Sequence, residues 1–345
     1  MKIGIAGFSS SGKSTVFHWL TGDAPDLSRA QQGQVGNPAV PDPRLGYLAS
    51  LFNPKKTTAT RMEILDTPGL HPTERRDNPR RLGILRDANG LLIVLNGFSG
   101  DGLTDELRRF REELIFADLE IVTNRIDKLK DLGKKTKPAK QREIEEAEMA
   151  LVQRIADCLE KGEGAAAAHL KPDEEKAVRS FQLLTLKPEL VFVNIAEDRI
   201  GKPLPEELLK VAPTAIQAPA KLEMELAELS DEDRKAFMQD LNLTDFSKDE
   251  TLHKIFAGMG QIVFFTVGED ECRSWAIPKG ATSQQGAGQI HTDLERGFVR
   301  AEVVSYDDFK KHGSMKEAKL HGVYRLESKT YVVNDGDIMH ILAST

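Results

Sequence analysis

Residues 7–15 read Gly7-Phe8-Ser9-Ser10-Ser11-Gly12-Lys13-Ser14-Thr15, which matches the pattern G-x-x-x-x-G-K-S-T. A short apolar run (residues 2–6) precedes this stretch and an amphipathic run (residues 15–20) follows it, so it lies between an expected strand and an expected helix. Glycines permit backbone turns that aim successive N–H groups inward, and the free N–H groups of a following helix point to the same place. The stretch therefore predicts a phosphate-binding loop, and its context disfavours an ordinary Gly/Ser-rich turn.

The side chains of this loop can be assigned to parts of a bound nucleoside triphosphate. Lys13 is expected to reach the β- and γ-phosphates, to support catalysis, and to face solvent when no ligand is bound. The Ser14 hydroxyl is expected to bind Mg²⁺. The predicted cofactors are therefore Mg²⁺ and ATP or GTP. The predicted nucleotide-binding residues of the loop are Ser10, Ser11, Gly12, Lys13, Ser14 and Thr15.

The composition narrows the class of protein. With 345 residues the chain is long enough for about two or three domains, and its net charge of −7 argues against a globally basic nucleic-acid binder. No apolar run approaches the roughly 18 residues of a membrane span, and the N-terminus lacks the pattern of a signal peptide. The two cysteines, Cys158 and Cys272, lie far apart and have no metal-binding spacing. We therefore expect a cytoplasmic protein that does not bind membranes.

A second phosphate-binding motif follows an alternating strand pattern at residues 61–66. It reads Asp66-Thr67-Pro68-Gly69. Beside a P-loop, Asp66 can hold a Mg²⁺-bound water and the Gly69 N–H can contact the γ-phosphate, so Asp66 and Ser14 are the predicted metal-binding residues. A plain turn is the alternative because D-x-x-G is short and common, but the upstream Lys13 favours the functional interpretation.

The groups expected to drive hydrolysis are weakly represented in this chain. Leu70 stands where Ras-like GTPases place a water-orienting Gln, and an apolar side chain cannot orient water. His71 is the nearby side chain that could replace it, so Leu70 and His71 mark the predicted catalytic position. Residues 22–43 correspond to a first switch segment, but residues 22–56 contain no Thr to bind magnesium and the γ-phosphate. We therefore expect slow hydrolysis.

Two motifs compete for recognition of the base. Asn124-Arg125-Ile126-Asp127 resembles the guanine-binding N-K-x-D, but it lies in an unbroken helical run and has Arg in place of Lys. Asn194-Ile195-Ala196-Glu197 follows a clean strand pattern, at the carboxyl end where ligands bind in such sheets. We choose the second motif and predict that Asn194, Ile195 and Glu197 bind the base. The Asp of N-K-x-D accepts bonds from guanine N1–H and N2–H₂, and the longer Glu197 is poorly placed for both, so guanine selectivity is not encoded.

Continuous apolar runs at residues 91–95 and 190–193 predict two buried strands of a parallel sheet, with roughly 95 residues between them. A crossover with one helix needs far fewer residues, so something is inserted. Residues 104–132 contain no Gly or Pro and repeat apolar positions every three or four residues, and residues 143–159 and 173–184 also have helical composition. Two long antiparallel helices that form a coiled-coil-like arm explain this pattern.

The sequence contains two basic clusters, of which the first lies at the expected tip of the arm. A solvated turn is the ordinary explanation of a lysine-rich tip, and contact with the phosphate backbone of RNA is the alternative. The expected tip of the arm carries Lys128, Lys130, Lys134, Lys135, Lys137 and Lys140. The second cluster follows Gly69 and consists of Arg75, Arg76, Arg80 and Arg81.

The pattern changes to β from residue 261 onward. The turn signal Asn334-Asp335-Gly336-Asp337 lies between the last two strand-like runs, and a small mixed β-grasp sheet fits the whole segment. We interpret His291, Thr292 and Asp293 as a turn and helix cap rather than a catalytic group. The strand-like runs are residues 262–267, 274–278, 299–304, 331–333 and 338–342.

Taken together, these motifs resemble the Obg-like ATPase (YchF) family over nearly the whole chain. The matching pieces are residues 7–15, Pro41-Asp42-Pro43-Arg44-Leu45, Asp66-x-x-Gly69-Leu70, residues 183–188, Asn194-x-x-Glu197, residues 227–230 with 237–241, and, most specifically, residues 288–301. The resemblance implies a G domain with a helical insertion and a C-terminal TGS domain. It also implies a preference for ATP over GTP and an association with ribosomes or translation.

The chain departs from the family pattern at three places. Family members carry a glycine-rich segment after the D-x-x-G-Leu, a switch threonine, and a histidine on the loop after the third strand that is thought to act in hydrolysis. The corresponding segments here are residues 71–76, 22–43 and 96–105, and they lack these features. The resemblance therefore implies a divergent member of the family.

The expected fold class is α/β, a P-loop GTPase-type parallel sheet with an inserted antiparallel helical arm and a C-terminal β-grasp (TGS) domain. The expected bounds are 1–105 and 188–258 for the G domain, 106–187 for the insertion and 259–345 for the TGS-like domain. The expected function is that of an ATP-preferring switch that hydrolyses ATP slowly to ADP. It would contact ribosomes or ribosomal RNA through the arm tip (residues 128–140) and the TGS domain. The alternatives are a GTPase with a drifted base motif and a hydrolysis-deficient, nucleotide-stabilised adaptor.

Overall fold

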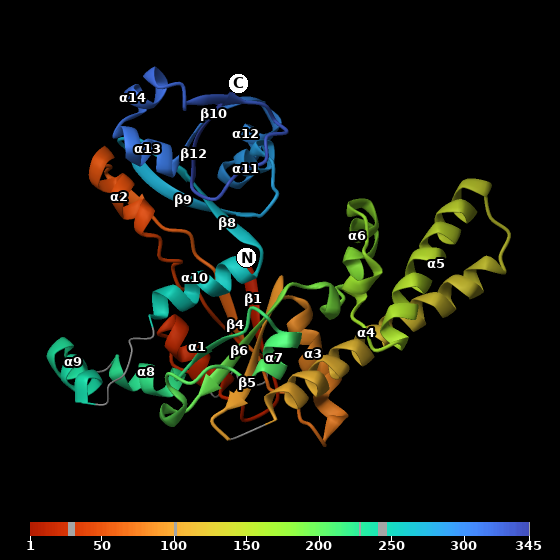
Figure 1. The fold of residues 1–345 in the computed structure, drawn as a ribbon. Coiled ribbons are helices and arrows are strands. Elements are labelled where there is room, and N and C mark those ends of the chain that lie inside the picture. Colours follow the sequence, from red (N-terminus) through yellow and green to blue (C-terminus); the bar gives the residue numbers. More distant parts are fainter. Residues whose placement is uncertain (27–31, 100–101, 228, 241–246, 345) are drawn as a thin grey trace. The chain divides into compact units, whose positions relative to one another are not determined.

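The computed structural model describes residues 1–26, 32–99, 102–227, 229–240 and 247–344, and within them the chain forms two units (Figure 1). The first unit comprises Met1–Gly36 and Glu63–Phe246, and the second comprises Asn37–Met62 and Ser247–Thr345. Each unit contains a six-stranded sheet of its own. In the part of the chain that the structure describes, no helix combines the length and apolarity needed to cross a bilayer.

The sheet of the first unit has the strand order β2-β4-β1-β5-β6-β7. All neighbouring strands pair in parallel except β2, which runs antiparallel to β4. Ile5 in β1 lies opposite Asp66 in β4 and Leu92 in β5, so the P-loop and the D-x-x-G motif leave the same edge of the sheet. The strands are β1 (Lys2–Ala6), β2 (Gln34–Gly36), β4 (Glu63–Asp66), β5 (Gly90–Gly97), β6 (Glu189–Ile195) and β7 (Ile216–Ala218).

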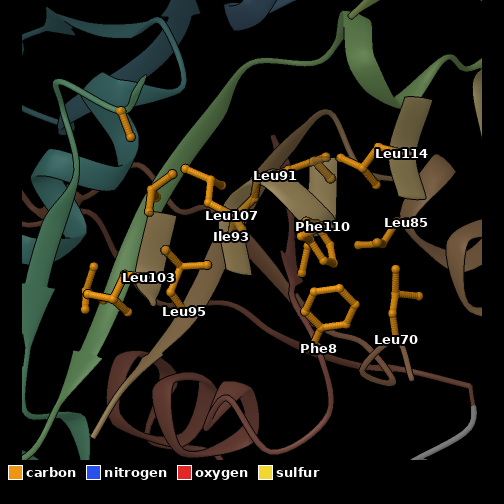
Figure 2. Close-up of a cluster of buried hydrophobic side chains, with 14 of the residues drawn as sticks. Phe8, Leu70, Leu85, Leu91, Ile93, Leu95, Leu103, Leu107, Phe110 and Leu114 are labelled. Atoms are coloured by element: carbon orange, nitrogen blue, oxygen red, sulfur yellow. The ribbon is translucent and has the colours of Figure 1, made fainter. Parts of the chain in front are cut away.

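Helices cover this sheet and bury a hydrophobic cluster beside its carboxyl edge. Phe8 and Phe110 meet edge to face with ring centroids 5.5 Å apart, and Leu70 and Leu85 pack nearby (Figure 2). Burying each such side chain stabilises the fold by about 1.5–3 kcal/mol. The helices of the first unit outside the arm are α1 (Lys13–Thr21), α3 (Asn78–Arg86), α7 (Glu206–Val211), α8 (Ala220–Leu226) and α9 (Asp231–Asp240).

The predicted arm is confirmed as two long helices, α4 (Leu103–Gly133) and α5 (Ala139–Glu160), that run side by side (Figure 1). They share a second hydrophobic cluster that includes Val122 and Ile126 of α4 and Ile155 of α5. The third predicted helix is shorter than the sequence pattern suggests. It covers only α6 (Pro172–Val178), because two turns of 3-10 helix follow and Gln182 adopts a left-handed φ of 49°.

The boundary between sheet and arm does not fall at residue 105 as predicted. Helix α4 begins at Leu103 and crosses that boundary without interruption. Leu107 and Leu114 belong to the cluster beside the sheet, whereas Ile115 and the residues beyond it belong to the arm cluster. One helix therefore serves two cores, and the arm remains part of the first unit.

The second unit is a mixed sheet with the strand order β11-β10-β12-β8-β9-β3. Strand pairs β12–β8 and β3–β9 are parallel and the remaining pairs are antiparallel. Its strands are β3 (Lys56–Thr58), β8 (Gln261–Thr266), β9 (Glu271–Pro278), β10 (Phe298–Ser305), β11 (Arg325–Glu327) and β12 (Asp337–Ala343). Its helices are α2 (Pro43–Phe52), α10 (Lys248–Gly258), α11 (Ser283–Ile290), α12 (Thr292–Arg296), α13 (Tyr306–His312) and α14 (Met315–Leu320).

Two local predictions in this unit have opposite outcomes. The interpretation of His291 as part of a helix cap is confirmed, because it is the N-cap of α12 and its Nδ1 accepts a bond from the Asp293 N–H at 3.2 Å. The predicted strand at residues 331–333 is reduced to a single antiparallel bridge between Val332 and Thr282. Its backbone groups bond to the start of α11 instead, where Tyr331 O accepts from Ser283 N and Val333 N donates to Ala281 O.

Residues 37–62 form an excursion from the first unit into the second, which the predicted domain bounds did not include. Within this excursion α2 spans Pro43–Phe52, and β3 adds a parallel edge strand to β9. Arg44 binds Asp335 at 2.7 Å, and the Thr60 N–H donates to Ser274 Oγ at 2.7 Å. These partners are distant in sequence, so the excursion folds with the C-terminal residues although β2 and β4 on either side belong to the first sheet.

Candidate functional site

The P-loop is shaped by three residues with positive φ, namely Gly7 (144°), Ser10 (64°) and Gly12 (85°). A Cβ on Gly7 would lie 2.5 Å from the Val94 carbonyl oxygen, and one on Gly12 would lie 2.1 Å from Asn194 Nδ2. Both positions therefore need glycine for close approach as well as for backbone freedom. The loop closes over the carboxyl end of β1 and leads directly into α1, as the sequence predicted.

A cavity of about 470 Å³ opens above this loop. Five of the six predicted loop residues line it: Ser10, Gly12, Lys13, Ser14 and Thr15. Ser11 does not line the cavity, because its side chain is buried with 1% of the residue surface exposed. The other lining residues are Ser9, Pro25, Asp26, Gln34, Asp66, Thr67, Pro68, Gly69, Asp77, Arg80, Arg81 and Ile84.

Lys13 is buried, so the expectation that it faces solvent without a ligand is wrong. Only 6% of its surface is exposed, and its Nζ donates a hydrogen bond of 2.6 Å to the Phe8 carbonyl. Burial lowers the pKa of Lys13 to about 8, opposed by Asp66 and Glu106 and reinforced by the positive charge of Arg81. The ammonium group is thus a buried cation in the lining of the cavity, where it is available to an anionic ligand.

Ser14 and Asp66, the predicted metal-binding residues, lie side by side. Ser14 Oγ donates to Asp66 Oδ2 at 2.8 Å, while Asp66 Oδ1 is buried and has no hydrogen-bond partner among the described residues. Burial raises the pKa of Asp66 against the opposing effects of Ser14 and Lys13. A hydroxyl beside a carboxylate with a free acceptor fits a Mg²⁺ ion that keeps waters and phosphate oxygens as its other ligands.

The D-x-x-G segment lies against the P-loop through backbone hydrogen bonds. Ser9 N donates to Leu70 O at 2.8 Å, and Leu70 N donates to Gly7 O at 3.0 Å. A Cβ on Gly69 would lie 2.5 Å from Lys13 Nζ, so Gly69 occupies the side of the cavity where a γ-phosphate contact is expected. The Leu70 side chain is 1% exposed and points into the hydrophobic cluster (Figure 2). Leu70 therefore anchors the segment and does not face the cavity.

His71 lies outside the cavity lining, so the structure does not bring it to the phosphates. Its Nδ1 accepts a bond from the Glu74 N–H at 2.9 Å, and its backbone N–H and carbonyl both bond to the Asn78 side chain. These bonds assign His71 to the turn before α3. Part of the first switch segment, residues 27–31, lies outside the described residues.

The chosen base motif reaches the P-loop through one residue. Asn194, at the end of β6, is 4% exposed, and its Nδ2 donates to the Ser11 carbonyl at 3.4 Å. Ile195 is buried in the hydrophobic cluster, and Glu197 is exposed on a short 3-10 turn (Glu197–Arg199), so neither lines the phosphate cavity. The competing Asn124 motif lies in the middle of α4, as expected.

The lysine-rich arm tip is partly neutralised by acids of the arm. Lys134 pairs with Asp131 at 2.8 Å, Lys130 pairs with Asp127 at 3.4 Å, and Lys137 pairs with Glu145 at 2.6 Å. Lys128, Lys135 and Lys140 are exposed. Those three exposed lysines are therefore the more available part of the tip.

Sequence reasoning assigned no role to Arg80 and Arg81, which line the cavity from α3. The available signal was their position in an arginine cluster that closely follows the D-x-x-G motif. Which of the four arginines face the phosphates depends on how α3 packs against the sheet, and the linear spacing alone does not specify that.

Comparisons with known proteins identify relatives over the whole chain. Residues 261–344 match YchF-GTPase_C, described as a protein of unknown function (DUF933). The chain is 33% identical to the Ribosome-binding ATPase YchF of Bacillus subtilis, over 98% of this chain and 97% of that protein. It is 32% identical to the protein of the same name from Escherichia coli O157:H7, over 99% of this chain and 98% of that protein.

Two solved structures share the fold over the whole length. The structure of the Schizosaccharomyces pombe YchF GTPase matches with a TM-score of 0.80 at 24% identity, covering 99% of this chain and 97% of that chain. A GTP binding protein from Pyrococcus horikoshii OT3 matches with a TM-score of 0.63 at 17% identity and full coverage of both chains. These matches show a P-loop GTPase-type α/β fold.

Proposed function

The chain belongs to the YchF family, and from this premise we propose that it binds ATP in preference to GTP, hydrolyses it slowly to ADP, and acts on the ribosome. The observation that carries the proposal is the phosphate cavity, in which Lys13, Gly69 and the Ser14–Asp66 pair converge. The printed names of the relatives, which describe them as ribosome-binding ATPases, support the same assignment and agree with a cytoplasmic location.

The residues of the cavity divide the work of binding a triphosphate. Backbone N–H groups of the P-loop and the first turn of α1 bind phosphate oxygens, and the Lys13 ammonium balances the charge of the β- and γ-phosphates. Ser14 and Asp66 would hold Mg²⁺, which when bound neutralises further negative charge on these phosphates. The Gly69 N–H would donate a hydrogen bond to the γ-phosphate and so distinguish ATP from ADP.

Slow hydrolysis is expected because the described residues around the cavity offer no obvious water-orienting group. Leu70 is in the core, and His71 is bonded within its own turn. Gln34 lines the cavity, but its Oε1 accepts from the Asp26 N–H at 2.7 Å and its Nε2 donates to the Ala24 carbonyl at 3.0 Å. A positioned general base typically contributes about 10²–10⁴-fold, so turnover without a partner should be well below 1 s⁻¹.

The preference for ATP rests on the base motif. Asn194 is placed beside the P-loop, whereas Glu197 is longer than the Asp that pairs with both guanine donors. The test is to titrate one purified sample with ATP and with GTP and to measure turnover of both. We expect the protein to bind ATP more tightly than GTP and to form ADP from ATP slowly.

The two alternatives predict different results in the same experiment. A tenfold preference for GTP, about 1.4 kcal/mol, would support a GTPase with a drifted motif and would contradict the assignment of Glu197. Tight nucleotide binding without turnover over several hours would support the nucleotide-stabilised adaptor.

A further inference from the structure

Helix α3 delivers two arginines to the phosphate cavity, and Arg81 is the more enclosed of them. Its side chain is half-buried, whereas Arg80 is exposed. The Arg81 Nη1 donates a hydrogen bond to the Gly69 carbonyl. The partner is a neutral carbonyl rather than a carboxylate, so the guanidinium charge beside the phosphate position is not cancelled by this bond.

Arg81 and Lys13 approach Gly69 together. A Cβ added to Gly69 would lie 2.5 Å from Lys13 Nζ, while Arg81 holds the carbonyl of the same residue. The two cations are close enough for Arg81 to reinforce the lowering of the Lys13 pKa that burial causes. Their mutual repulsion is relieved when an anionic group binds between them.

ATP hydrolysis at this site would develop negative charge that a cation such as Arg81 could stabilise. In ATP hydrolysis the water oxygen forms a bond to the γ-phosphorus, and the bond from that phosphorus to the β–γ bridging oxygen breaks. The bonding electron pair goes to the bridging oxygen, and a water proton is released, so that ATP⁴⁻ and H₂O give ADP³⁻, HPO₄²⁻ and H⁺. Charge spreads over the γ-phosphoryl oxygens in the transition state, where cationic groups act most strongly.

On the basis of the proposed ATPase function, we propose that Arg81 acts as an internal arginine that leaves the Gly69 carbonyl and binds the γ-phosphoryl oxygens in the transition state. Arginine presents a planar pair of donors to a phosphoryl group, which lysine cannot reproduce. P-loop switch proteins with an arginine in cis hydrolyse their nucleotide at about 10⁻² s⁻¹, against about 3–5 × 10⁻⁴ s⁻¹ for those that depend on an external arginine. Arg81 therefore raises a rate that remains slow.

The test compares Arg81→Met with the matched control Arg76→Met. Methionine keeps an unbranched apolar stem at the half-buried position, and Arg76 is an exposed member of the same cluster that does not line the cavity. Single-turnover hydrolysis of ATP should fall at least 100-fold in Arg81→Met and stay within threefold of wild type in Arg76→Met. ADP affinity should stay within threefold in both variants, because ADP lacks the γ-phosphoryl group.

A second readout separates catalysis from a structural role at Gly69. Wild-type protein should bind ADP with aluminium fluoride, which mimics the transferring phosphoryl group, at least tenfold more tightly than ADP alone. Arg81→Met should lose this gain, and Arg81→Lys should recover little of it. If Arg81 only supports the Gly69 backbone, ADP affinity and thermal stability would fall together, which would overturn the proposal.

The outcomes also distinguish this inference from the proposed function. Failure of wild-type protein to bind ATP or ADP would overturn both. If wild-type protein binds but turnover is undetectable, the slow-ATPase assignment fails, and the aluminium fluoride comparison still decides the role of Arg81. An Arg81→Met variant with a wild-type rate and a wild-type aluminium fluoride gain would overturn the inference alone.

Discussion

Lys13 combines a positive charge with a buried position, and this combination determines what its removal should do. The ammonium group has one short hydrogen bond, to the Phe8 carbonyl, and its burial opposes the charged state. We expect Lys13→Met to weaken ATP binding by more than tenfold, over about 1.4 kcal/mol, because the phosphates lose their main side-chain cation. The free energy of unfolding should change by less than about 1 kcal/mol, because the lost hydrogen bond is offset by the lost desolvation cost.

ATP titration and urea unfolding of the same samples check this prediction. Lys202→Met is a suitable control, because Lys202 is an exposed lysine of the first unit that does not line the cavity. Unchanged ATP affinity in Lys13→Met would contradict the assignment of residues 7–15 as a phosphate-binding loop.

At the residue scale, sequence reasoning selected residues that the fold places around one cavity, but it did not predict their environments. The P-loop pattern identified Lys13, Ser14 and Gly12 because this motif is local and its chemistry depends on spacing. It did not anticipate that Lys13 would be buried, or that Ile195 would pack into the core. Those properties depend on neighbours that the fold brings from other elements.

A single buried carboxylate joins α4 to its surroundings at the base of the arm. Asp118 is completely buried and accepts bonds from Arg86, from the backbone N–H groups of Leu184 and Thr185, and from the Thr185 hydroxyl. Asp118→Ala should destabilise the protein by about 3–5 kcal/mol, because it leaves two N–H groups without their acceptor and leaves the Arg86 guanidinium with only the Gln182 and Ala117 carbonyls and no carboxylate. Urea unfolding followed by circular dichroism measures this change.

Glu120→Ala on the same helix is the matched control, because Glu120 is exposed. Its effect should stay within about 0.5 kcal/mol. A loss below 1 kcal/mol in Asp118→Ala would show that the base of the arm rearranges to satisfy these donors.

The arm tip gives a prediction about the ribosome. We expect the variant Lys128→Gln, Lys135→Gln, Lys140→Gln to weaken ribosome association and to flatten its dependence on salt, because fewer counterions are released from RNA. Sedimentation with ribosomes at several salt concentrations measures both quantities. The matched control is Lys130→Gln, Lys134→Gln, whose lysines are paired with acids of the same helix and should matter less. Wild-type ribosome binding and wild-type salt dependence in the triple variant would leave the tip as a solvated turn.

At the scale of the whole molecule, the excursion of residues 37–62 couples the stability of α2 to the C-terminal residues. Arg44 and the Val263 N–H both donate to the Asp335 carboxylate. Burial alone would raise the pKa of Asp335, but these bonds hold it below its ordinary value. A carboxyl group whose pKa is lower in the folded than in the unfolded protein stabilises the fold above its unfolded pKa, near 4, and this stabilisation is lost as the pH falls further.

Asp335→Asn should therefore destabilise the second unit at pH 7 by about 1–2 kcal/mol. The expected loss is modest because the Asp335 side chain is nearly half exposed and solvent weakens its interaction with Arg44. The difference from wild type should disappear between about pH 5 and pH 3. Hydrogen exchange should report the loss in α2 as well as in β8, and not in β1. Asp270→Asn is the control, because its pair with Lys55 is largely exposed and should contribute little. A constant difference across this pH range would contradict the role of the charge.

The whole-molecule organisation shows where sequence patterns stop being sufficient. The buried strands β5 and β6 and the two arm helices were predicted because each produces a periodic or continuous apolar pattern within itself. The membership of residues 37–62 in the second unit depends on Asp335 and Ser274, which lie more than 200 positions away. No local pattern encodes that pairing.

This excursion also has a consequence for folding of the chain while it is being synthesised. During synthesis residues 37–62 are made first. About 200 further residues are added before β8, the next strand of the second unit along the chain, is complete. At about 5–20 residues per second this is a wait of roughly 10–40 s. For that time Leu45 and Leu48, which are buried in the finished protein, have no surface to cover them. The nascent chain therefore exposes an apolar helix in the middle of an otherwise folding unit, at the stage when aggregation and chaperone binding compete with folding.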